Sequence, residues 1–278
     1  MSPNRSAAES VAETYYDSAD ADRFYEKIWG GEDIHIGLYD EPGISIPAAS
    51  HKTVSLMTAQ LKNLNNSSRA IDLGAGYGGS ARELARTFGC HVTCLNLSER
   101  QNARNRKLNK QKRFEHKISV THGSFESIPD PDASMDLVWS QDAFLHSGQR
   151  EKVMDEIDRV LKPGGELIFT DPMQSDDCPP GVLQPVYDRL ELASLASVGW
   201  YRNQLAARGF EEISYLPLVE QLRNHYDRVG QELAMRQQEL VGEISTDYLI
   251  RMLQGLANWV QAADKGYLAW GILHFRKP

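Results

Sequence analysis

The sequence has few cysteines, no zinc-site spacing and no long apolar run. Three cysteines among 278 residues are too few, and odd in number, for a disulfide framework, and Cys90 and Cys94 flank or lie in an apolar run, so we expect buried free thiols. No stretch approaches the ~18 apolar residues of a transmembrane helix, and the start MSPNRSAAES lacks the apolar core of a secretory signal. These absences predict a cytoplasmic protein without a metal site.

The sequence also lacks an excess of positive charge. It has 30 Lys and Arg against 38 Asp and Glu, a net charge of -8, which argues against a nucleic-acid partner because such proteins usually concentrate positive charge. With 41% hydrophobic residues, the chain is long enough to bury one large core. We expect a single globular unit.

Short apolar runs alternate with helical patterns between residues 69 and 171. The segments 81–88 and 153–161 each place apolar residues on one helical face, and KPGG after the second is a helix stop. Strand and helix in alternation indicate a parallel sheet covered on both faces. The fold class predicted is therefore α/β, with a doubly wound core.

Two regions fall outside this alternation. Residues 1–66 hold the aromatic cluster YYDSADADRFYEKIWGGEDIHIGLYD and are predicted to form a lid or cap, leaving 67–278 as the core. Helical insertions are expected within that core at about 176–197 and 218–266. Because ligands of such sheets bind at the carboxyl ends of the strands, the lid and both insertions are expected to cover that edge.

The stretch IDLGAGYGGS contains Gly74, Gly76 and Gly79 in the spacing G-x-G-x-x-G. This spacing is weak when taken alone, because it suits a dinucleotide, another adenosine cofactor or a merely tight strand-to-helix turn. Asp72 stands two residues before the first glycine, where its carboxylate would repel a pyrophosphate. It suits instead the ammonium group of S-adenosylmethionine, which contains no phosphate.

The ends of the next two strands agree with an adenosine cofactor. Asn96 follows the second strand, where a ribose-binding acid is usual, and its amide can still bond ribose hydroxyls. Ser124 and Phe125 follow the third and are placed to flank an adenine ring. The alternative for Phe125 is an ordinary core aromatic.

These motifs together resemble the S-adenosylmethionine-dependent methyltransferases with a seven-stranded Rossmann-like sheet. The resemblance implies an antiparallel last strand, for which GYLAWGILHFRK is the candidate, and S-adenosylhomocysteine as product. It completes the expected cofactor-binding set, which is Asp72, Gly74, Gly76, Asn96, Leu97, Gln101, Ser124, Phe125 and Gln141.

A closer resemblance covers almost the whole chain. The segments FYEKIWGGEDIHIGLY, LNLSERQNARN, WSQDAFLHSG, FTDPMQSDDCPPGVL, SVGWYR and NHYDRV look like the sarcosine/dimethylglycine N-methyltransferases, and more distantly like the phosphoethanolamine methyltransferases. The closer family implies methylation of sarcosine and dimethylglycine, ending in glycine betaine.

Methylation of an amine requires a neutral nitrogen, whereas aliphatic amines titrate near ~10. The site must therefore remove or bias a proton. His146, just after the fourth strand, and Tyr25, in the lid, match a Tyr–His latch of the phosphoethanolamine methyltransferases. We carry that role to Tyr25 and His146 as the expected catalytic pair; the alternatives are a surface histidine and a lid-packing tyrosine.

The acceptor's carboxylate and its cationic nitrogen suggest an arginine clamp and an aromatic wall. Expected substrate-binding residues are Trp29, Tyr187, Arg189, Tyr201, Arg202 and Tyr226, with Arg228 as a further clamp candidate. The sequence does not rank them. Gln141 and Asp142 are expected to line the methionine end of the cofactor, with His35 and Gly37 approaching it from the lid.

Three other interpretations remain open. The literal G-x-G-x-x-G match permits a NAD-dependent oxidoreductase, against which Asp72 and the lack of an acid at Asn96 count. A noncatalytic adenosine-cofactor sensor would retain the same motifs. Within methyltransferases, phosphoethanolamine or another small amine is the rival acceptor.

Overall fold

The protein is built on one large mixed sheet. The computed structural model describes residues 6–190 and 192–278. Strand order in the seven-stranded sheet is β3-β2-β1-β4-β5-β9-β7, and a short second sheet pairs β6 with β8. The bounds of the strands are β1 Arg69–Leu73, β2 His91–Asn96, β3 Ile118–His122, β4 Met135–Gln141, β5 Leu161–Thr170, β6 Met173–Gln174, β7 Glu211–Pro217, β8 Leu268–Ala269 and β9 Gly271–Arg276.

The helices alternate with these strands and extend beyond them at both ends of the chain. Their bounds are α1 Ala7–Asp17, α2 Ala19–Phe24, the π-helical turn η1 Tyr25–Trp29, α3 Ile46–Gln60, α4 Gly79–Phe88, α5 Glu99–Gln111, the 3-10 turn η2 Phe144–His146, α6 Arg150–Val160, α7 Gln184–Tyr187, α8 Val198–Ala207, α9 Val219–Leu240 and α10 Thr246–Asp264.

The predicted α/β class is confirmed, including the antiparallel last strand. β1 pairs in parallel with β2 and β4, and β4 with β5, whereas β9 runs antiparallel to β5 and to β7. The C-terminal segment forms β8 and β9 as expected. The helix before KPGG ends at Val160, and β5 starts at Leu161 and includes the KPGG segment.

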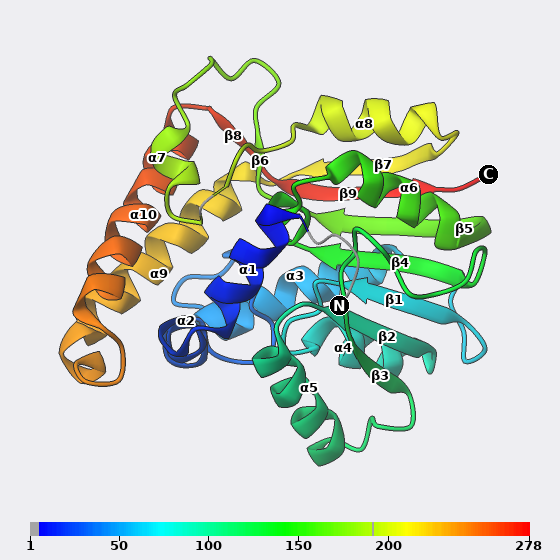
Figure 1. Ribbon diagram of the computed structural model, residues 1–278, viewed down its shortest axis with the longest axis horizontal. Coiled ribbons are helices and arrows are strands. Elements are labelled where there is room, and N and C mark those ends of the chain that lie inside the picture. Colours follow the sequence, from blue (N-terminus) through cyan, green and yellow to red (C-terminus); the bar gives the residue numbers. More distant parts are fainter. Residues whose placement is uncertain (1–5, 191) are drawn as a thin grey trace.

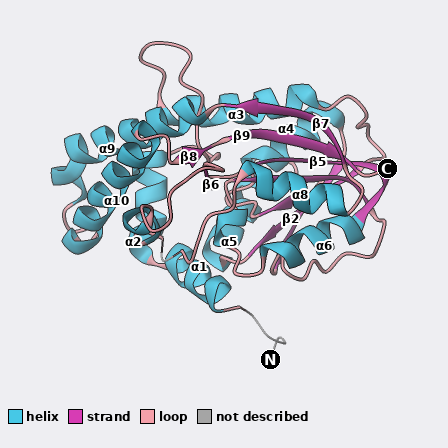
Figure 2. Cartoon of the chain, turned by 90° about the horizontal axis from the view of Figure 1, so that it is seen from above, coloured by secondary structure: helices cyan, strands magenta, loops and turns pink. Residues whose placement is uncertain are grey.

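Helices cover both faces of the sheet (Figure 2). Apolar side chains of α3 and α4 pack with one face, and those of α6 and α8 with the other. Cys90 and Cys94 are buried free thiols in the first of these layers, as predicted. Because α3 packs against the sheet, the part of the proposed 1–66 lid that lies clear of the core ends before α3.

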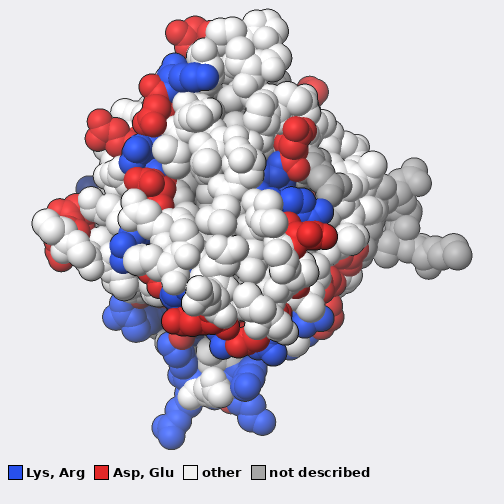
Figure 3. All heavy atoms as spheres, turned by 90° about the vertical axis from the view of Figure 1, so that its left-hand side faces the viewer, with Lys and Arg blue, Asp and Glu red and all other residues white. Residues whose placement is uncertain are grey.

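A third apolar cluster lies beyond the carboxyl ends of the parallel strands. It joins residues of α2, η1, α9 and α10, and Figure 1 shows these helices, with α1 and α7, gathered at that end of the sheet. The side of the molecule on which they lie carries acidic and basic side chains beside one another, and the basic ones gather lower down, toward α5 (Figure 3).

Within residues 6–190 and 192–278, no helix combines the length and apolar character needed to cross a bilayer. The same part of the chain contains no group of three or more His, Cys, Asp or Glu side chains arranged to hold a metal ion.

Candidate active site

The glycine turn after β1 needs its glycines for two reasons. Gly74 and Gly76 have φ angles of 79° and 50°, which other residues rarely adopt. A side chain at Gly74 would also collide with Ala143 beyond β4, and one at Gly76 would come within 3.1 Å of Ile34. The turn is therefore held closely between the end of β4 and the lid loop that precedes α3.

A cavity opens over this turn, at the carboxyl ends of the parallel strands, where the ligands of such sheets bind. We call it the cofactor cavity. Seven residues of the expected cofactor set line it, namely Gly74, Gly76, Asn96, Leu97, Gln101, Phe125 and Gln141. The remaining lining residues are Glu9, Ala12, Tyr16, Ile34, His35, Ser98, Asp142, Ala143 and His146.

The polar groups of this cavity leave hydrogen-bonding capacity for a ligand. Gln141 accepts from Ser80 Oγ at 2.6 Å and from Trp139 Nε1 at 3.2 Å, but its buried Nε2 has no partner among the described residues. An orphaned buried donor is costly unless a ligand satisfies it. Asn96 is oriented by a 3.0 Å bond to Gln101 Oε1.

Two expected cofactor residues lie outside the lining. Asp72 is buried beneath the glycine turn, where burial and the nearby Asp33 raise its pKa to about 8. Ser124 donates to Glu9 of α1 and accepts from the backbone N–H of Glu126. Asp72 Oδ2 is buried without a partner among the described residues, and Ser124 contacts the lid helix, so their contacts with a cofactor stay predictions.

A second, smaller cavity adjoins the first and we call it the acceptor cavity. Tyr16, Ile34, Asp142 and His146 line both cavities. The two cavities meet at these side chains, which is where a group passing from a cofactor to an acceptor must cross. The other lining residues are Tyr25, Trp29, Ile36, Leu145, Pro172, Arg189, Leu190 and Tyr226.

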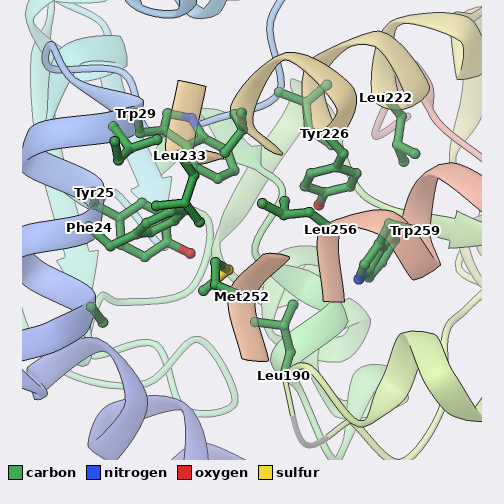
Figure 4. Packing of buried hydrophobic residues seen from close by; sticks show 14 of the residues in the cluster. Phe24, Tyr25, Trp29, Leu190, Leu222, Tyr226, Leu233, Met252, Leu256 and Trp259 are labelled. Carbon is green, nitrogen blue, oxygen red and sulfur yellow. The ribbon is translucent and has the colours of Figure 1, made fainter. Parts of the chain in front are cut away.

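Three of the predicted aromatic and lid residues come together on the wall of the acceptor cavity. Tyr25 and Trp29 begin and end η1 and pack with ring centroids 5.2 Å apart. Tyr226 comes from α9, with its ring centroid 6.4 Å from that of Trp29. Figure 4 shows Tyr25 and Trp29 on one side of this apolar cluster and Tyr226 on the other. Such a wall favours a quaternary ammonium through cation–π attraction.

Arg189 is the arginine that the structure brings to this cavity. Its guanidinium carbon lies 5.1 Å from the centroid of the Tyr226 ring, and its buried Nε and Nη1 have no partner among the described residues. Room for its stem is made by Gly255 in α10, where an added Cβ would come within 2.6 Å of Arg189 Cγ and Cδ. A buried guanidinium with free donors matches a carboxylate ligand.

Four other candidates for substrate binding are directed elsewhere. Arg202 forms a bidentate ion pair with Glu212 at the surface, and Arg228 lies on α9 with Glu232 at 3.9 Å. The Tyr201 hydroxyl donates to Asp171 Oδ2 at 2.8 Å, and its ring packs in the core beneath α8.

Tyr187 is the fourth, and its hydroxyl donates to Gln174 Oε1 at 3.4 Å. Tyr187, Tyr201 and Arg202 are therefore absent from the lining of the acceptor cavity, and each already has another partner.

His146 has a different tyrosine partner from the one expected. Tyr16 of α1, not Tyr25, lies with its hydroxyl 2.9 Å from His146 Nε2. Tyr25 lies behind Tyr16, with their ring centroids 5.7 Å apart. Burial, with the charges of Arg189 and Arg150, lowers the pKa of His146 to about 4. The imidazole is therefore neutral near pH 7.

Asp142 ties the lid to the sheet. This residue follows β4 with a φ of 53°, and its Oδ2 accepts from the backbone N–H of Ile36 at 2.8 Å. Its Oδ1 accepts from Thr170 Oγ1 at 2.9 Å and from Trp270 Nε1 at 2.7 Å. Burial raises the pKa of Asp142 above its ordinary value, although these hydrogen bonds favour the carboxylate.

The two lid residues expected near the cofactor, His35 and Gly37, lie in different places. His35 lines the cofactor cavity, whereas Gly37 donates its backbone N–H to His225 Nδ1 at 3.0 Å. His225 is fully buried, and burial together with Arg189 lowers its pKa to about 3. Gly37 therefore anchors the lid loop to α9.

Sequence reasoning missed the lining residues of α1, above all Tyr16. A signal was present, since Glu9, Ala12 and Tyr16 have the i, i+3, i+7 spacing of one helical face. The adjacent tyrosines Tyr15 and Tyr16 differ only in the face that they occupy.

This sheet order, with a glycine turn after its first strand and a ligand cavity at the strand ends, defines a methyltransferase of the S-adenosylmethionine-dependent, seven-stranded class. Residues 71–169 match the family model described as methyltransferase domain. A phosphoethanolamine N-methyltransferase of Haemonchus contortus, solved with S-adenosylhomocysteine, shares this fold at a TM-score of 0.83 with 17% identity, over 99% of this chain and 61% of that one.

Relatives of much higher identity define the family. The sarcosine/dimethylglycine N-methyltransferase of Halorhodospira halochloris is 52% identical over 96% of each chain, and that of Aphanothece halophytica 51% over 98% of each. A crystal structure assigned as a sarcosine dimethylglycine methyltransferase of Galdieria sulphuraria is 42% identical, with a TM-score of 0.89 over 95% of this chain and 98% of that one. The chain belongs to the sarcosine/dimethylglycine N-methyltransferase family and is an S-adenosylmethionine-dependent N-methyltransferase.

Replacing Asp142→Asn should impair both lid docking and turnover. Asparagine tolerates the positive φ, but its amide nitrogen cannot accept from one of the donors that Asp142 now serves. We expect kcat/KM to fall by about 100-fold, consistent with the ~1.5–3 kcal/mol of a hydrogen bond to a charged group. Steady-state kinetics with calorimetric binding of S-adenosylhomocysteine would measure this, and unchanged values of both would contradict the role of Asp142.

Proposed function

We propose that this enzyme transfers a methyl group from S-adenosylmethionine to the amine of dimethylglycine, and of sarcosine, so that glycine betaine and S-adenosylhomocysteine are the final products. The observation that carries this proposal is Arg189, a buried guanidinium with free donors in an aromatic cavity that adjoins the cofactor cavity. The names of the relatives agree with it.

The residues of the cofactor cavity fit S-adenosylmethionine. Gly74 and Gly76 let backbone approach the ligand, and the free amide N–H groups of Gln141 suit the carboxylate of its methionine end. Asn96 is placed to bond ribose hydroxyls, and Phe125 to pack on adenine. When bound, S-adenosylmethionine supplies an electrophilic methyl group on a sulfonium. The neighbouring Asp142 carboxylate favours positive charge at the point where the cavities meet.

The main contribution of the acceptor cavity to catalysis is to orient the acceptor amino acid. Arg189 holds the acceptor carboxylate, and Tyr25, Trp29 and Tyr226 face its nitrogen, so the acceptor is oriented at both ends. Tyr16, whose hydroxyl lies 2.9 Å from the neutral His146, offers its oxygen to the N–H of the acceptor amine, and the pair stays uncharged beside that nitrogen. The apolar wall excludes water from the site.

The same contacts favour an amino acid over phosphoethanolamine. A phosphate bears up to two negative charges and needs more cationic groups than a carboxylate. Arg189 is the arginine that lines the acceptor cavity, whose other described lining residues are aromatic, apolar or acidic apart from His146. We further propose that the enzyme acts in the cytoplasm on free amino acids, without a metal, and that the part of the predicted 1–66 lid that precedes α3 covers its site.

Mass spectrometry of reactions with S-adenosylmethionine would test the proposed function. Glycine, sarcosine, dimethylglycine and phosphoethanolamine are supplied separately, and we expect betaine from dimethylglycine and from sarcosine. Phosphoethanolamine is expected to give no product. Methylation of phosphoethanolamine alone would refute the proposed acceptor while leaving the methyltransferase class intact.

Tyr16→Phe should reduce turnover more than Tyr25→Phe, because Tyr16 contacts His146 directly. A positioned acid–base group contributes ~100-fold or more, so we expect a loss of that order for Tyr16→Phe and less than about tenfold for Tyr25→Phe. Activity of the unmodified enzyme should also fall as the pH drops toward 4, where His146 becomes protonated.

For that comparison, kcat/KM would be measured between about pH 3.5 and 9, with cofactor binding as the control. A larger loss for Tyr25→Phe than for Tyr16→Phe would restore the pairing that the sequence suggested.

Arg189→Gln should raise the KM for dimethylglycine and leave cofactor affinity unchanged. Loss of a charge-assisted hydrogen bond costs ~1.5–3 kcal/mol, so we expect kcat/KM to fall by about 10- to 100-fold. Arg202→Gln is the matched control, because Arg202 is paired with Glu212 at the surface. Equal effects of the two substitutions would contradict a carboxylate clamp at Arg189.

A further inference from the structure

A large groove lies on the opposite side of α1 from the cofactor cavity. It has a volume of about 860 Å³ and runs between α1, the segment around α7 and α10. Its walls include Thr14 and Tyr15 of α1, Arg189 after α7, and Tyr248 and Gln254 of α10. Figure 1 shows α1, α7 and α10 together at the end of the sheet where the site lies.

Helix α1 is the partition between this groove and the cofactor cavity. Glu9, Ala12 and Tyr16 line the cofactor cavity, whereas Val11, Thr14, Tyr15 and Ser18 line the groove. At 3.6 residues per turn these two sets lie on opposite faces of one helix. Both faces of α1 thus border a cavity.

Arg189 is common to the groove and the acceptor cavity. Its stem crosses α10 at Gly255, which also lines the groove, and its guanidinium reaches Tyr226 in the acceptor cavity. A glycine inside a helix is destabilising relative to alanine. Its close approach to Arg189 gives a physical reason for that cost.

The acceptor needs a route that the cofactor does not fill. The acceptor cavity meets the cofactor cavity at one end, through Tyr16, Asp142 and His146, and a bound cofactor occupies that side. The other neighbouring cavity is the groove, reached past Arg189. On the wall of the groove, Tyr15 and Tyr248 are joined hydroxyl to hydroxyl at 3.1 Å, with their rings stacked.

The groove also suits a small zwitterion. Hydroxyl and amide side chains line it, and Arg189 and Arg251 supply positive charge. Of its two acidic residues, Asp20 already accepts from the backbone N–H and hydroxyl of Ser245, and Asp188 accepts from Gln184 Nε2. The groove thus presents charges of both signs, as a zwitterion requires, and Arg189 is the charged residue that it shares with the acceptor cavity.

We propose that the groove between α1 and α10 is the path by which the acceptor amino acid enters and betaine leaves, with the Tyr15–Tyr248 pair as its gate. This inference rests on the proposed function, since it takes the acceptor to be an amino acid held by Arg189. The cofactor has its own cavity on the other face of α1.

Filling the groove with a large side chain tests this path. Gln254→Trp on α10 and Thr14→Trp on α1 obstruct it from opposite walls, at exposed positions. Ala257→Trp is the matched control, because Ala257 is exposed on the same helix and lies outside the groove lining. Betaine formation from dimethylglycine, thermal unfolding and calorimetric binding of S-adenosylhomocysteine are measured for the three variants and the unmodified enzyme.

We expect kcat/KM for dimethylglycine to fall at least tenfold in both groove variants and less than twofold in the control, with unchanged cofactor binding and unfolding temperature. If the unmodified enzyme makes betaine and both groove variants are fully active, the proposed path is wrong, but the proposed function stands. An unmodified enzyme that binds S-adenosylhomocysteine but makes no betaine would overturn the proposed function, and with it the path.

Discussion

The carboxylate of Asp142 is the interaction on which the rest of the site depends. It collects a backbone N–H from the lid at Ile36, a hydroxyl from β5 at Thr170 and an indole N–H from Trp270, next to β9. Segments far apart in the sequence are thereby fixed to the end of β4. Since Asp142 also lines both cavities, the group that docks the lid is the group that places negative charge at the crossing point. One carboxylate therefore both holds the lid loop and supplies the negative charge between the two cavities.

The lid is kept in place by local capping and by a few contacts with the core. Ser6 and Glu9 form a capping box at the start of α1, and Ser18 ends α1 and caps α2. Two core residues bond to α1: Ser124 donates to Glu9, and Ser98 donates to Asp17 at 2.5 Å. A helix of 11 residues is marginal in isolation, so its order follows from these contacts. We infer that α1 is the element whose displacement opens both of the cavities beside it.

The core could be predicted from the sequence because its signals are local. Apolar periodicity, the KPGG helix stop and the glycine turn each act within one or two elements, and the antiparallel β9 followed from the resemblance. The site was less predictable, because its pairings are long-range choices between like residues. Tyr16 and Tyr25 are both lid tyrosines, yet the helical phase of α1 brings Tyr16 to His146. The sequence does not distinguish Arg189 from Arg202. In the structure Arg202 forms an ion pair with Glu212 at the surface, whereas Gly255 leaves room for the Arg189 side chain in the interior. Tyr201 was likewise expected to contact the substrate, but its hydroxyl donates to Asp171 instead.

The weak basicity of His146 suits the chemistry of a nitrogen that becomes permanently charged. Its burial near Arg189 and Arg150 keeps the imidazole neutral, so it can accept a hydrogen bond from Tyr16 without repelling a cation. A protonated imidazole there would oppose the quaternary product, and an added carboxylate would stabilise the ammonium form of the acceptor, which cannot react. Aromatic faces avoid both problems, because they attract the cationic product without binding a proton. The acceptor cavity therefore confines its fixed positive charge to Arg189, at the carboxylate end, and leaves the nitrogen end to neutral rings and the shared border with Asp142.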